Sequence, residues 1–486
     1  MVIKPSEGGD RRTSCSFLVH WLRGVFVLPG IGHVSGSLNL GALEDVRAAR
    51  CLLSAGLRLG FGVVLVALVA AGFAALFRLG LGFALHHVAG TTDVVSAMRH
   101  APVWARLLCP ACGGLLAGGV GLMVARSAGG SGVGDVMEAI VLGRVRLSLR
   151  VTLLKSAASW LAIAFGGSIG REGPLIQFGG ASGKVVGDWL HLSTDRARLL
   201  IAAGTAAGFA AAYNTPFAAV LFVIEVVTGV VVIDTVLPVL VATVIATAVS
   251  RAFVGEGPIY GERAFHLQSS WELLSFAGLG VLAALGAQGF MRLLKLGERI
   301  FRQPWLKLPW RPALGGLLAG TVVALLPECA GNGYEPLNAM LDGASAVGFV
   351  ALLLVGKCVA TTASVSSGSP GGVFTPTLLI GGAIGVLYGH ALSSVGASPG
   401  AVGGYALVGM AAATAATTHA PLMAAVMVFE LSGDYAIALP LVLATAISTL
   451  LSRHLGRQSI YTAELMERGL GWEVTIEGRR VLKPPG

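Results

Sequence analysis

Glu172 has the residue type and the setting best suited to chemistry in this sequence. It lies in the segment Gly-Ser-Ile-Gly-Arg-Glu-Gly-Pro at residues 167–174, between long apolar stretches. A carboxylate at membrane depth is costly, and by default it is a hypothesis for a functional site. Because Pro174 suits the first turn of a helix, we expect Glu172 at a helix N-terminus, where free N–H groups and the helix dipole attract anions. The carboxylate is therefore suited to fill a site built for a mobile anion.

A second glycine-rich break, Gly-Ser-Gly-Val-Gly at residues 130–134, offers a hydroxyl group. Ser131 is a hydrogen-bond donor, and Gly130 and Gly132 allow the backbone to approach a ligand closely. Taken alone, the same motif is also typical of a flexible turn between helices.

A third break, Gly-Gly-Val-Phe-Thr-Pro at residues 371–376, carries no charged side chain. We expect it to contribute backbone N–H groups at the start of a helix over residues 376–391, together with an aromatic edge. Such groups stabilise an anion without holding it as tightly as a lysine would.

Other polar residues allow more than one interpretation. Tyr461 lies past the last long apolar stretch, where a tyrosine is usually an interfacial residue. Glu225 and Glu430 end two matched apolar segments, and they could bond helix ends or lie on a proton path. Cys109 and Cys112 have the spacing of a redox or metal pair, but their apolar surroundings favour small hydrophobic residues. We predict no metal and no cofactor.

The composition is that of a polytopic, all-α membrane protein. Of 486 residues, 55% are hydrophobic and 12% are charged, whereas a soluble domain has about 25% charged residues. The mean hydropathy is +0.78. The formal net charge is +9, but the basic residues are dispersed beside apolar stretches, as juxtamembrane anchors are. This distribution argues against a nucleic-acid partner.

Apolar stretches of two kinds alternate along the chain. Those suited to span a membrane lie near 52–86, 102–126, 149–166, 236–254, 272–294, 312–327, 347–361 and 434–452. Shorter pieces, interrupted by glycine and proline, lie at 173–189, 196–212, 215–227, 370–391, 401–416 and 420–430. Because non-helical backbone at membrane depth is tolerated only inside protein or along a cavity, the shorter pieces indicate broken helices that meet inside the molecule.

An internal repeat supports this organisation. Residues 174–183 align without gaps with residues 376–385, and residues 216–225 align with residues 421–430. The two matches keep their order. A two-fold repeat of interrupted apolar segments is typical of a transporter site at the interface between the repeats.

These patterns divide the chain into three parts. We expect a cytoplasmic arm at residues 1–45, a transmembrane domain at residues 46–470 and a short cytoplasmic tail at residues 471–486. Repeat one covers about 100–255 and repeat two about 310–455. The tail is too short for an independent regulatory domain.

Four motifs together resemble those of the CLC family of chloride channels and chloride/proton antiporters. They are residues 130–134, residues 170–174, residues 372–376 and the late Tyr461, and they occur in the order of that family. The resemblance implies an 18-helix inverted repeat, with broken and re-entrant helices meeting at a midplane anion site. It also implies a homodimer with one anion pathway per subunit, a bacterial type without a regulatory CBS region, and a bacterial inner membrane location with cytoplasmic termini.

The resemblance also implies roles for individual residues. Ser131 and Tyr461 resemble the hydroxyl donors to a central chloride, and Val373 and Phe374 resemble the donors of backbone N–H groups to that ion. Glu172 resembles the gating glutamate, which blocks the outer site when ionised and swings away when protonated. The surrounding backbone and helix N-termini would come from Gly130, Gly132, Gly170, Gly173 and Gly372.

Two positions depart from the family pattern. Gly134 replaces a proline, which should loosen the start of the following helix. Val226 replaces the acidic residue that proton-coupled members carry after the glutamate matched by Glu225. Asp234 could substitute as an acid, although an N-cap of the helix over 236–254 is the favoured interpretation. Glu225 and Asp234 are therefore the candidates for a proton path.

The sequence thus predicts glutamate-gated chloride transport that is passive or weakly proton-coupled. The alternative is a chloride/proton antiporter with an unconventional proton path. A membrane enzyme would need a nucleophile with a positioned base or paired metal-binding carboxylates, and an organic-anion transporter would need several midplane cations; neither pattern is evident. The expected partners are chloride, protons and the lipid bilayer.

Overall fold

The computed structural model describes most of the chain, with several gaps. The described residues are 41–124, 132–141, 147–255, 260, 271–343, 345–394, 402–456, 458–467, 471–474 and 480–483. Ser131 and Gly130 therefore lie outside them. So do residues 1–40 of the predicted arm, while the first described helix begins inside that arm.

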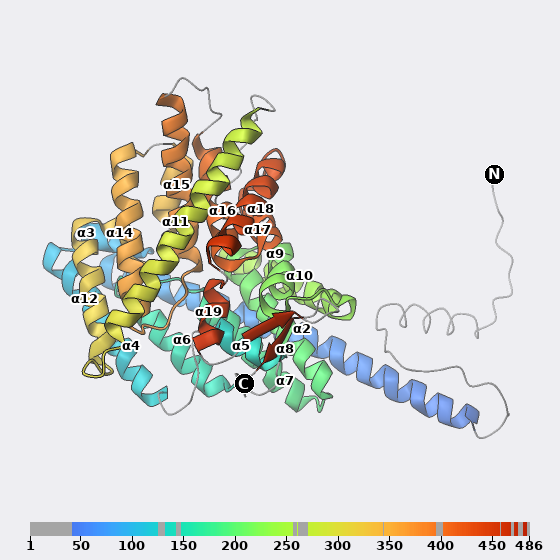
Figure 1. Ribbon diagram of the computed structural model, residues 1–486. Helices are drawn as coiled ribbons and strands as arrows, with labels where there is room; N and C mark the ends of the chain where they lie inside the picture. Colours follow the sequence, from blue (N-terminus) through green and yellow to red (C-terminus); the bar gives the residue numbers. More distant parts are fainter. Residues whose placement is uncertain are drawn as a thin grey trace.

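The described part is almost entirely helical (Figure 1). Its first half contains α2 (Gly41–Ala89), α3 (Val94–His100), α4 (Val103–Val124), α5 (Val133–Val141), α6 (Leu149–Ala164), α7 (Glu172–Trp189), α8 (Thr194–Tyr213), α9 (Pro216–Phe222), the π-helix η1 (Val223–Thr228) and α10 (Ile233–Val254). Its second half contains α11 (Glu272–Phe301), α12 (Trp310–Leu325), the 3₁₀-helix η2 (Pro327–Cys329), α13 (Tyr334–Leu341), α14 (Val347–Ser366), α15 (Phe374–Ser394), α16 (Val402–Thr418), α17 (Pro421–Ser432), α18 (Ala438–Leu455) and α19 (Ile460–Glu467). A short antiparallel ribbon of β1 (Gly471–Val474) and β2 (Arg480–Lys483) follows.

Seven helical stretches in the described residues are long and apolar enough to cross a membrane. They are Ala55–His100, Val103–Val124, Ile233–Phe253, Glu272–Phe301, Val347–Ser366, Phe374–Ser394 and Ala438–Met466. The helices α6 and α12 have 16 residues each, fewer than the roughly 20 that a perpendicular span needs. The chain is therefore a multi-pass membrane protein in which full and partial spans are mixed. The predicted spans at 149–166 and 312–327 are short helices, whereas the predicted short piece at 370–391 falls in a helix long enough to span.

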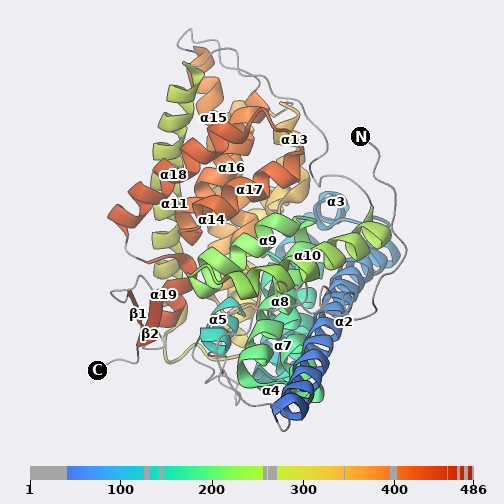
Figure 2. The ribbon, with the colours of Figure 1, turned by 90° about the vertical axis from the view of Figure 1, so that its right-hand side faces the viewer.

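The two halves repeat one helix-pair contact. A Cβ on Gly179 of α7 would fall on the carbonyl oxygen of Gly204 in α8, and a Cβ on Gly381 of α15 would fall on that of Gly409 in α16. Small residues let membrane helices approach until their backbones touch. Both views show α14–α18 above α5, α7 and α8, with α9 beneath α17 (Figures 1 and 2).

The helices α8 and α16 form the interior of the molecule. Every residue of α8 from Leu200 to Tyr213 is buried, and so is every residue of α16 from Gly403 to Thr418. A helix that is buried all round lacks the polar face of an amphipathic helix. Burial on all sides therefore explains why these two segments are rich in alanine and glycine and carry no charge in their buried parts.

The matched glutamates Glu225 and Glu430 link the two halves of the chain, because each binds a helix start in the opposite half. Glu225 of η1 accepts a hydrogen bond from the backbone N–H of Met423 at 2.7 Å, and Glu430 of α17 accepts one from that of Ala218 at 2.8 Å. Each carboxylate also accepts the N–H of the preceding residue, at 3.3 Å and 3.0 Å respectively. Each glutamate thus satisfies free N–H groups at the first turn of a helix in the other half. Bonding of helix ends, one of the two interpretations of these residues, is therefore observed.

Candidate functional site

The starts of α7 and α15 meet where two glycines pair. The N–H of Gly170 donates to the carbonyl oxygen of Gly372 at 2.7 Å, and the N–H of Gly372 donates to that of Gly170 at 2.8 Å. A Cβ on either glycine would overlap the carboxylate of Glu172. Glycine at both positions is therefore required by the close approach of two backbones and one side chain.

Glu172 is the first residue of α7, and its carboxylate binds the first turn of α15. The side chain is buried, with 1% of the residue exposed. Oε1 accepts the backbone N–H of Phe374 at 2.8 Å, and Oε2 accepts the hydroxyl of Thr375 at 3.1 Å. The expected position of Glu172 at a helix N-terminus is confirmed. The helix that its carboxylate caps, however, belongs to the other repeat.

Tyr213 and Thr375 extend this arrangement, and sequence reasoning missed both. The Tyr213 hydroxyl lies 2.9 Å from the Thr375 hydroxyl. Since Thr375 donates to Glu172, Tyr213 can donate to Thr375 and complete a relay of neutral donors. Tyr213 ends α8, and it lies 162 residues from its partner. That separation leaves no local sequence signal, although Thr375 stands inside a recognised motif.

Aromatic rings connect the Glu172 region with Tyr461. The ring of Phe374 is 5.6 Å from that of Phe209, which is 4.7 Å from that of Phe222, which is 6.1 Å from that of Tyr461. Tyr461 is 7% exposed, so it is a buried residue rather than an interfacial one. This aromatic row forms one rigid wall between two of the residues that the sequence singles out.

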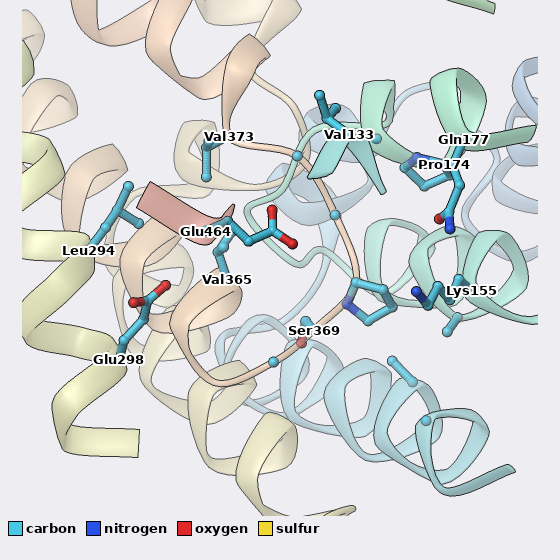
Figure 3. Close-up of a pocket in the computed structure, with 18 of the residues that line it drawn as sticks. Val133, Lys155, Pro174, Gln177, Leu294, Glu298, Val365, Ser369, Val373 and Glu464 are labelled. Atoms are coloured by element: carbon cyan, nitrogen blue, oxygen red, sulfur yellow. The ribbon is translucent and has the colours of Figure 1, made fainter. Parts of the chain in front are cut away.

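A cavity of about 960 Å³ lies at the Tyr461 end of this row (Figure 3). Its lining includes Glu172, Gly173, Gly372, Val373 and Tyr461. The fold therefore brings Gly372, Val373 and Tyr461 together with Glu172 around a single space, whereas Phe374 contacts Glu172 without lining the cavity. Charged side chains also line the cavity, namely Glu138, Lys155, Lys295, Glu298, Arg302, Arg311 and Glu464.

Buried polar contacts hold α5 against α7. Asp135, in the first turn of α5, is 2% exposed. Its Oδ2 accepts from Gln177 at 3.0 Å and from Lys155 at 3.1 Å. Gly132, with φ +93°, comes so close to α7 that a Cβ would lie 3.1 Å from the carbonyl oxygen of Gly173. Gly132 is thus held at the start of α7, although this polar cluster was not predicted.

The two candidates for a proton path, Glu225 and Asp234, lie outside the lining of the cavity. Glu225 caps α17, and Asp234 is exposed in the first turn of α10. The interpretation of Asp234 as an N-cap is wrong, because the helix begins at Ile233 and its N-cap residue is Val232. Neither acid occurs among the described residues that line the cavity. Val226 is buried, with 6% of its surface exposed.

Comparison with known proteins identifies the family. The model of the family described as "Voltage gated chloride channel" matches residues 113–453. The chain belongs to the CLC family. A ClcB-like chloride channel protein of Ralstonia nicotianae is 42% identical over 76% of this chain and 88% of its own length. The voltage-gated ClC-type chloride channel ClcB of Escherichia coli is 35% identical over 82% of this chain and 95% of its own length.

The fold of this CLC chain also matches solved structures. A slow cyanobacterial Cl⁻/H⁺ antiporter superposes with a TM-score of 0.75 at 24% identity, covering 85% of this chain and 98% of its own. At that identity the likeness establishes the fold alone. CLC proteins are channels or transporters rather than enzymes, and this agrees with the function class that the sequence predicts.

Proposed function

We propose that this protein conducts chloride across a membrane through a pathway gated by Glu172. The observation that carries the proposal is the buried carboxylate on the first turn of α15, bonded to the Phe374 N–H and the Thr375 hydroxyl. These donors are neutral. Neutral donors and helix N-termini offset the free-energy cost of dehydrating an anion without trapping it, as a permeation site requires. The Glu172 carboxylate occupies a position with such donors.

Competition between the Glu172 carboxylate and chloride for the same donors gates the anion pathway. Phe374 is a proposed N–H donor to the central chloride, together with Val373, and its N–H is bonded to Glu172. One N–H cannot serve both anions fully, so chloride has to displace the carboxylate. Protonation removes the charge of Glu172 and weakens its hold on these donors. Opening therefore depends on both pH and chloride concentration.

Tyr461 and Ser131 complete the proposed central site by donating hydroxyl groups. Tyr461 lines the same cavity as Glu172. It is connected to Phe374 through the ring contacts of the aromatic row. The proposal also assigns backbone groups of the path to Gly130, Gly132, Gly170, Gly173 and Gly372.

The proposed transport mode is passive or weakly proton-coupled. The buried Val226 cannot carry a proton, and the adjacent Glu225 is engaged as a helix cap. The second candidate is chloride/proton exchange through an unconventional path that uses Glu225 or Asp234. It is favoured by the similarity in fold to a protein described as a Cl⁻/H⁺ antiporter.

The proposed setting is a homodimer in a bacterial inner membrane, with both termini in the cytoplasm. Large apolar side chains are exposed on α10 and α18, including Leu237, Val244, Leu439 and Leu450. Lipid or a second subunit would cover this surface. The orientation rests on the cytoplasmic placement of the dispersed basic anchors.

Chloride efflux from proteoliposomes tests the function directly. The purified chain should release chloride down its gradient faster than protein-free liposomes, and acidification should accelerate the release. A rate equal to that of protein-free liposomes at every pH would overturn the proposal. Simultaneous chloride and proton electrodes separate passive conduction from exchange.

A further inference from the structure

Thr375 is a buried hydroxyl donor that the proposed central chloride site does not use. It is the second residue of α15, and 1% of the residue is exposed. Its hydroxyl donates to Oε2 of Glu172 at 3.1 Å, beside the Phe374 N–H that donates to Oε1 at 2.8 Å. The aligned residue of the other repeat is Gly173, which has no side chain. Of this aligned pair, only Thr375 can therefore supply a side-chain donor.

The order of protons from Tyr213 through Thr375 to Glu172 is fixed by the last member. An ionised carboxylate can only accept, so the single proton of the Thr375 hydroxyl points toward Glu172. The Thr375 oxygen is then left to accept the Tyr213 proton, across 2.9 Å. A chloride ion is also an acceptor only. The same order of protons therefore suits an anion that takes the place of the carboxylate.

Packing holds the Tyr213 hydroxyl in position. Tyr213 is 1% exposed, and its ring centroid lies 4.9 Å from that of Phe209 and 5.5 Å from that of Phe374. A tyrosine side chain has two torsions, so a packed ring fixes where its hydroxyl lies. The bond from Tyr213 favours the rotamer in which Oγ1 of Thr375 faces Glu172. Tyr213 is therefore placed to orient the Thr375 hydroxyl.

A second threonine at the same helix start shows the ordinary use of this side chain. Thr377 is 2% exposed, and its hydroxyl donates to the carbonyl oxygen of Val373, four residues earlier, at 2.8 Å. Such a bond back to the preceding turn is a common local arrangement for threonine in helices. The Thr375 hydroxyl instead bonds to residues 203 and 162 positions away in the chain. It is thus directed across the interface between the two repeats.

We propose that the Thr375 hydroxyl, oriented by Tyr213, is a ligand of the anion that replaces the Glu172 carboxylate and selects chloride over more weakly hydrated anions. This inference rests on the proposed chloride pathway, to which it adds a determinant of selectivity. Chloride is more strongly hydrated than nitrate, so it depends more on directed donors once its water is removed. The oriented hydroxyl therefore stabilises chloride more than nitrate at this position.

The test measures the efflux of chloride and of nitrate from proteoliposomes in a Glu172→Ala background, where no carboxylate competes for the hydroxyl. Thr375→Val keeps the shape of the side chain but loses the donor. It should lower the chloride-to-nitrate ratio about tenfold, the size expected for one hydrogen bond to a charged group. Thr375→Ser, which keeps the hydroxyl, should retain most of the ratio. An unchanged ratio in Thr375→Val would overturn the proposal, because the hydroxyl would then serve the carboxylate alone.

Tyr213→Phe tests the positioning role in the same background. Loss of the ring hydroxyl should lower the ratio about threefold, as loss of a neutral hydrogen bond would. Tyr213→Phe combined with Thr375→Val should give the ratio of Thr375→Val alone, since Tyr213 acts through Thr375. This double variant also avoids leaving one hydroxyl buried without its partner. Additive losses, or an unchanged ratio in Tyr213→Phe, would overturn the positioning role.

Thr377→Val is the matched control, because it removes a hydroxyl that bonds the preceding turn of the same helix start. Its ratio should equal that of the Glu172→Ala background. An equal loss in this variant would show a general effect of the helix start, and it would overturn the assignment to Thr375.

Failure of the underlying function gives a different result. In that case the parent and all variants would match protein-free liposomes for both anions. An unchanged ratio in Thr375→Val, with chloride efflux and Glu172 gating intact, would leave the proposed function standing.

Discussion

Gly170 and Gly372 form two backbone hydrogen bonds with each other, at 2.7 Å and 2.8 Å. The two glycines belong to the two halves of the chain, and each precedes the start of a helix. Their pairing fixes α7 and α15 so closely that the Glu172 carboxylate reaches the Phe374 N–H. The Glu172 carboxylate is therefore positioned by this backbone pairing together with the Thr375 hydroxyl.

Replacement of Glu172 by glutamine should open the pathway. The amide keeps the size of the side chain but loses charge-assisted hydrogen bonds, which are worth roughly 1.5–3 kcal/mol in proteins. Chloride efflux at neutral pH should rise at least about tenfold, and most of its pH dependence should disappear. Glu328→Gln is the matched control, since that carboxylate pairs with Arg99 instead. A parental pH profile in Glu172→Gln would refute the gate.

Replacement of Gly372 by alanine tests the same gate without a change of charge. The added Cβ overlaps the Glu172 carboxylate, so the side chain has to leave the α15 helix start. Efflux at neutral pH should increase, while overpacking should lower the stability by about 1–3 kcal/mol. Gly289→Ala is the control, because a Cβ there meets nothing within 4 Å. Parental efflux together with parental stability in Gly372→Ala would contradict the described packing.

Proton movement should be weak or absent when chloride flows down its gradient. The buried Val226 offers no ionisable group, and Glu225 is bonded to the N–H groups of α17. A pH electrode outside chloride-loaded proteoliposomes measures the movement, with a protonophore added at the end to calibrate the signal. Sustained uphill proton pumping would favour the exchange mechanism and overturn the passive one.

Loss of the carboxylate of either Glu225 or Glu430 should lower the stability of the fold. Glu225→Ala and Glu430→Ala each remove the acceptor for two backbone N–H groups, and loss of a helix cap costs about 0.5–2 kcal/mol. The two variants should lower the midpoint of thermal unfolding in detergent by similar amounts, because their environments repeat. The ratio of chloride to nitrate efflux should not change. A destabilisation confined to one of the two variants would contradict the symmetric role.

Local patterns in the sequence predict much of this architecture. Glycine and proline breaks within apolar stretches indicate the interrupted helices, and the repeated Pro-to-Glu spacing relates the two halves. The carboxylate in the break at 167–174 indicates a helix N-terminus. Each of these inferences depends on residues close together in the chain.

Contacts between distant segments account for what the sequence did not reveal. The Thr375–Tyr213 bond and the Asp135–Lys155 pair join different helices. Their partners are ordinary polar residues without a distinguishing spacing. The N-cap interpretation of Asp234 failed for a local reason instead. The helix begins inside an apolar run at Ile233, where no polar residue marks its start.

The reciprocal capping by Glu225 and Glu430 has a consequence for biosynthesis. The acceptor for the backbone N–H of Phe217 is Glu430, which lies 213 residues further along the chain. Since ribosomes add about 5–20 residues per second, the nascent first half spends on the order of 10–40 seconds without it. Translation therefore passes through a stage in which a membrane-inserted segment has an incomplete helix end. The first turn of α9 gains its acceptor only when Glu430 of the second half has been made and inserted.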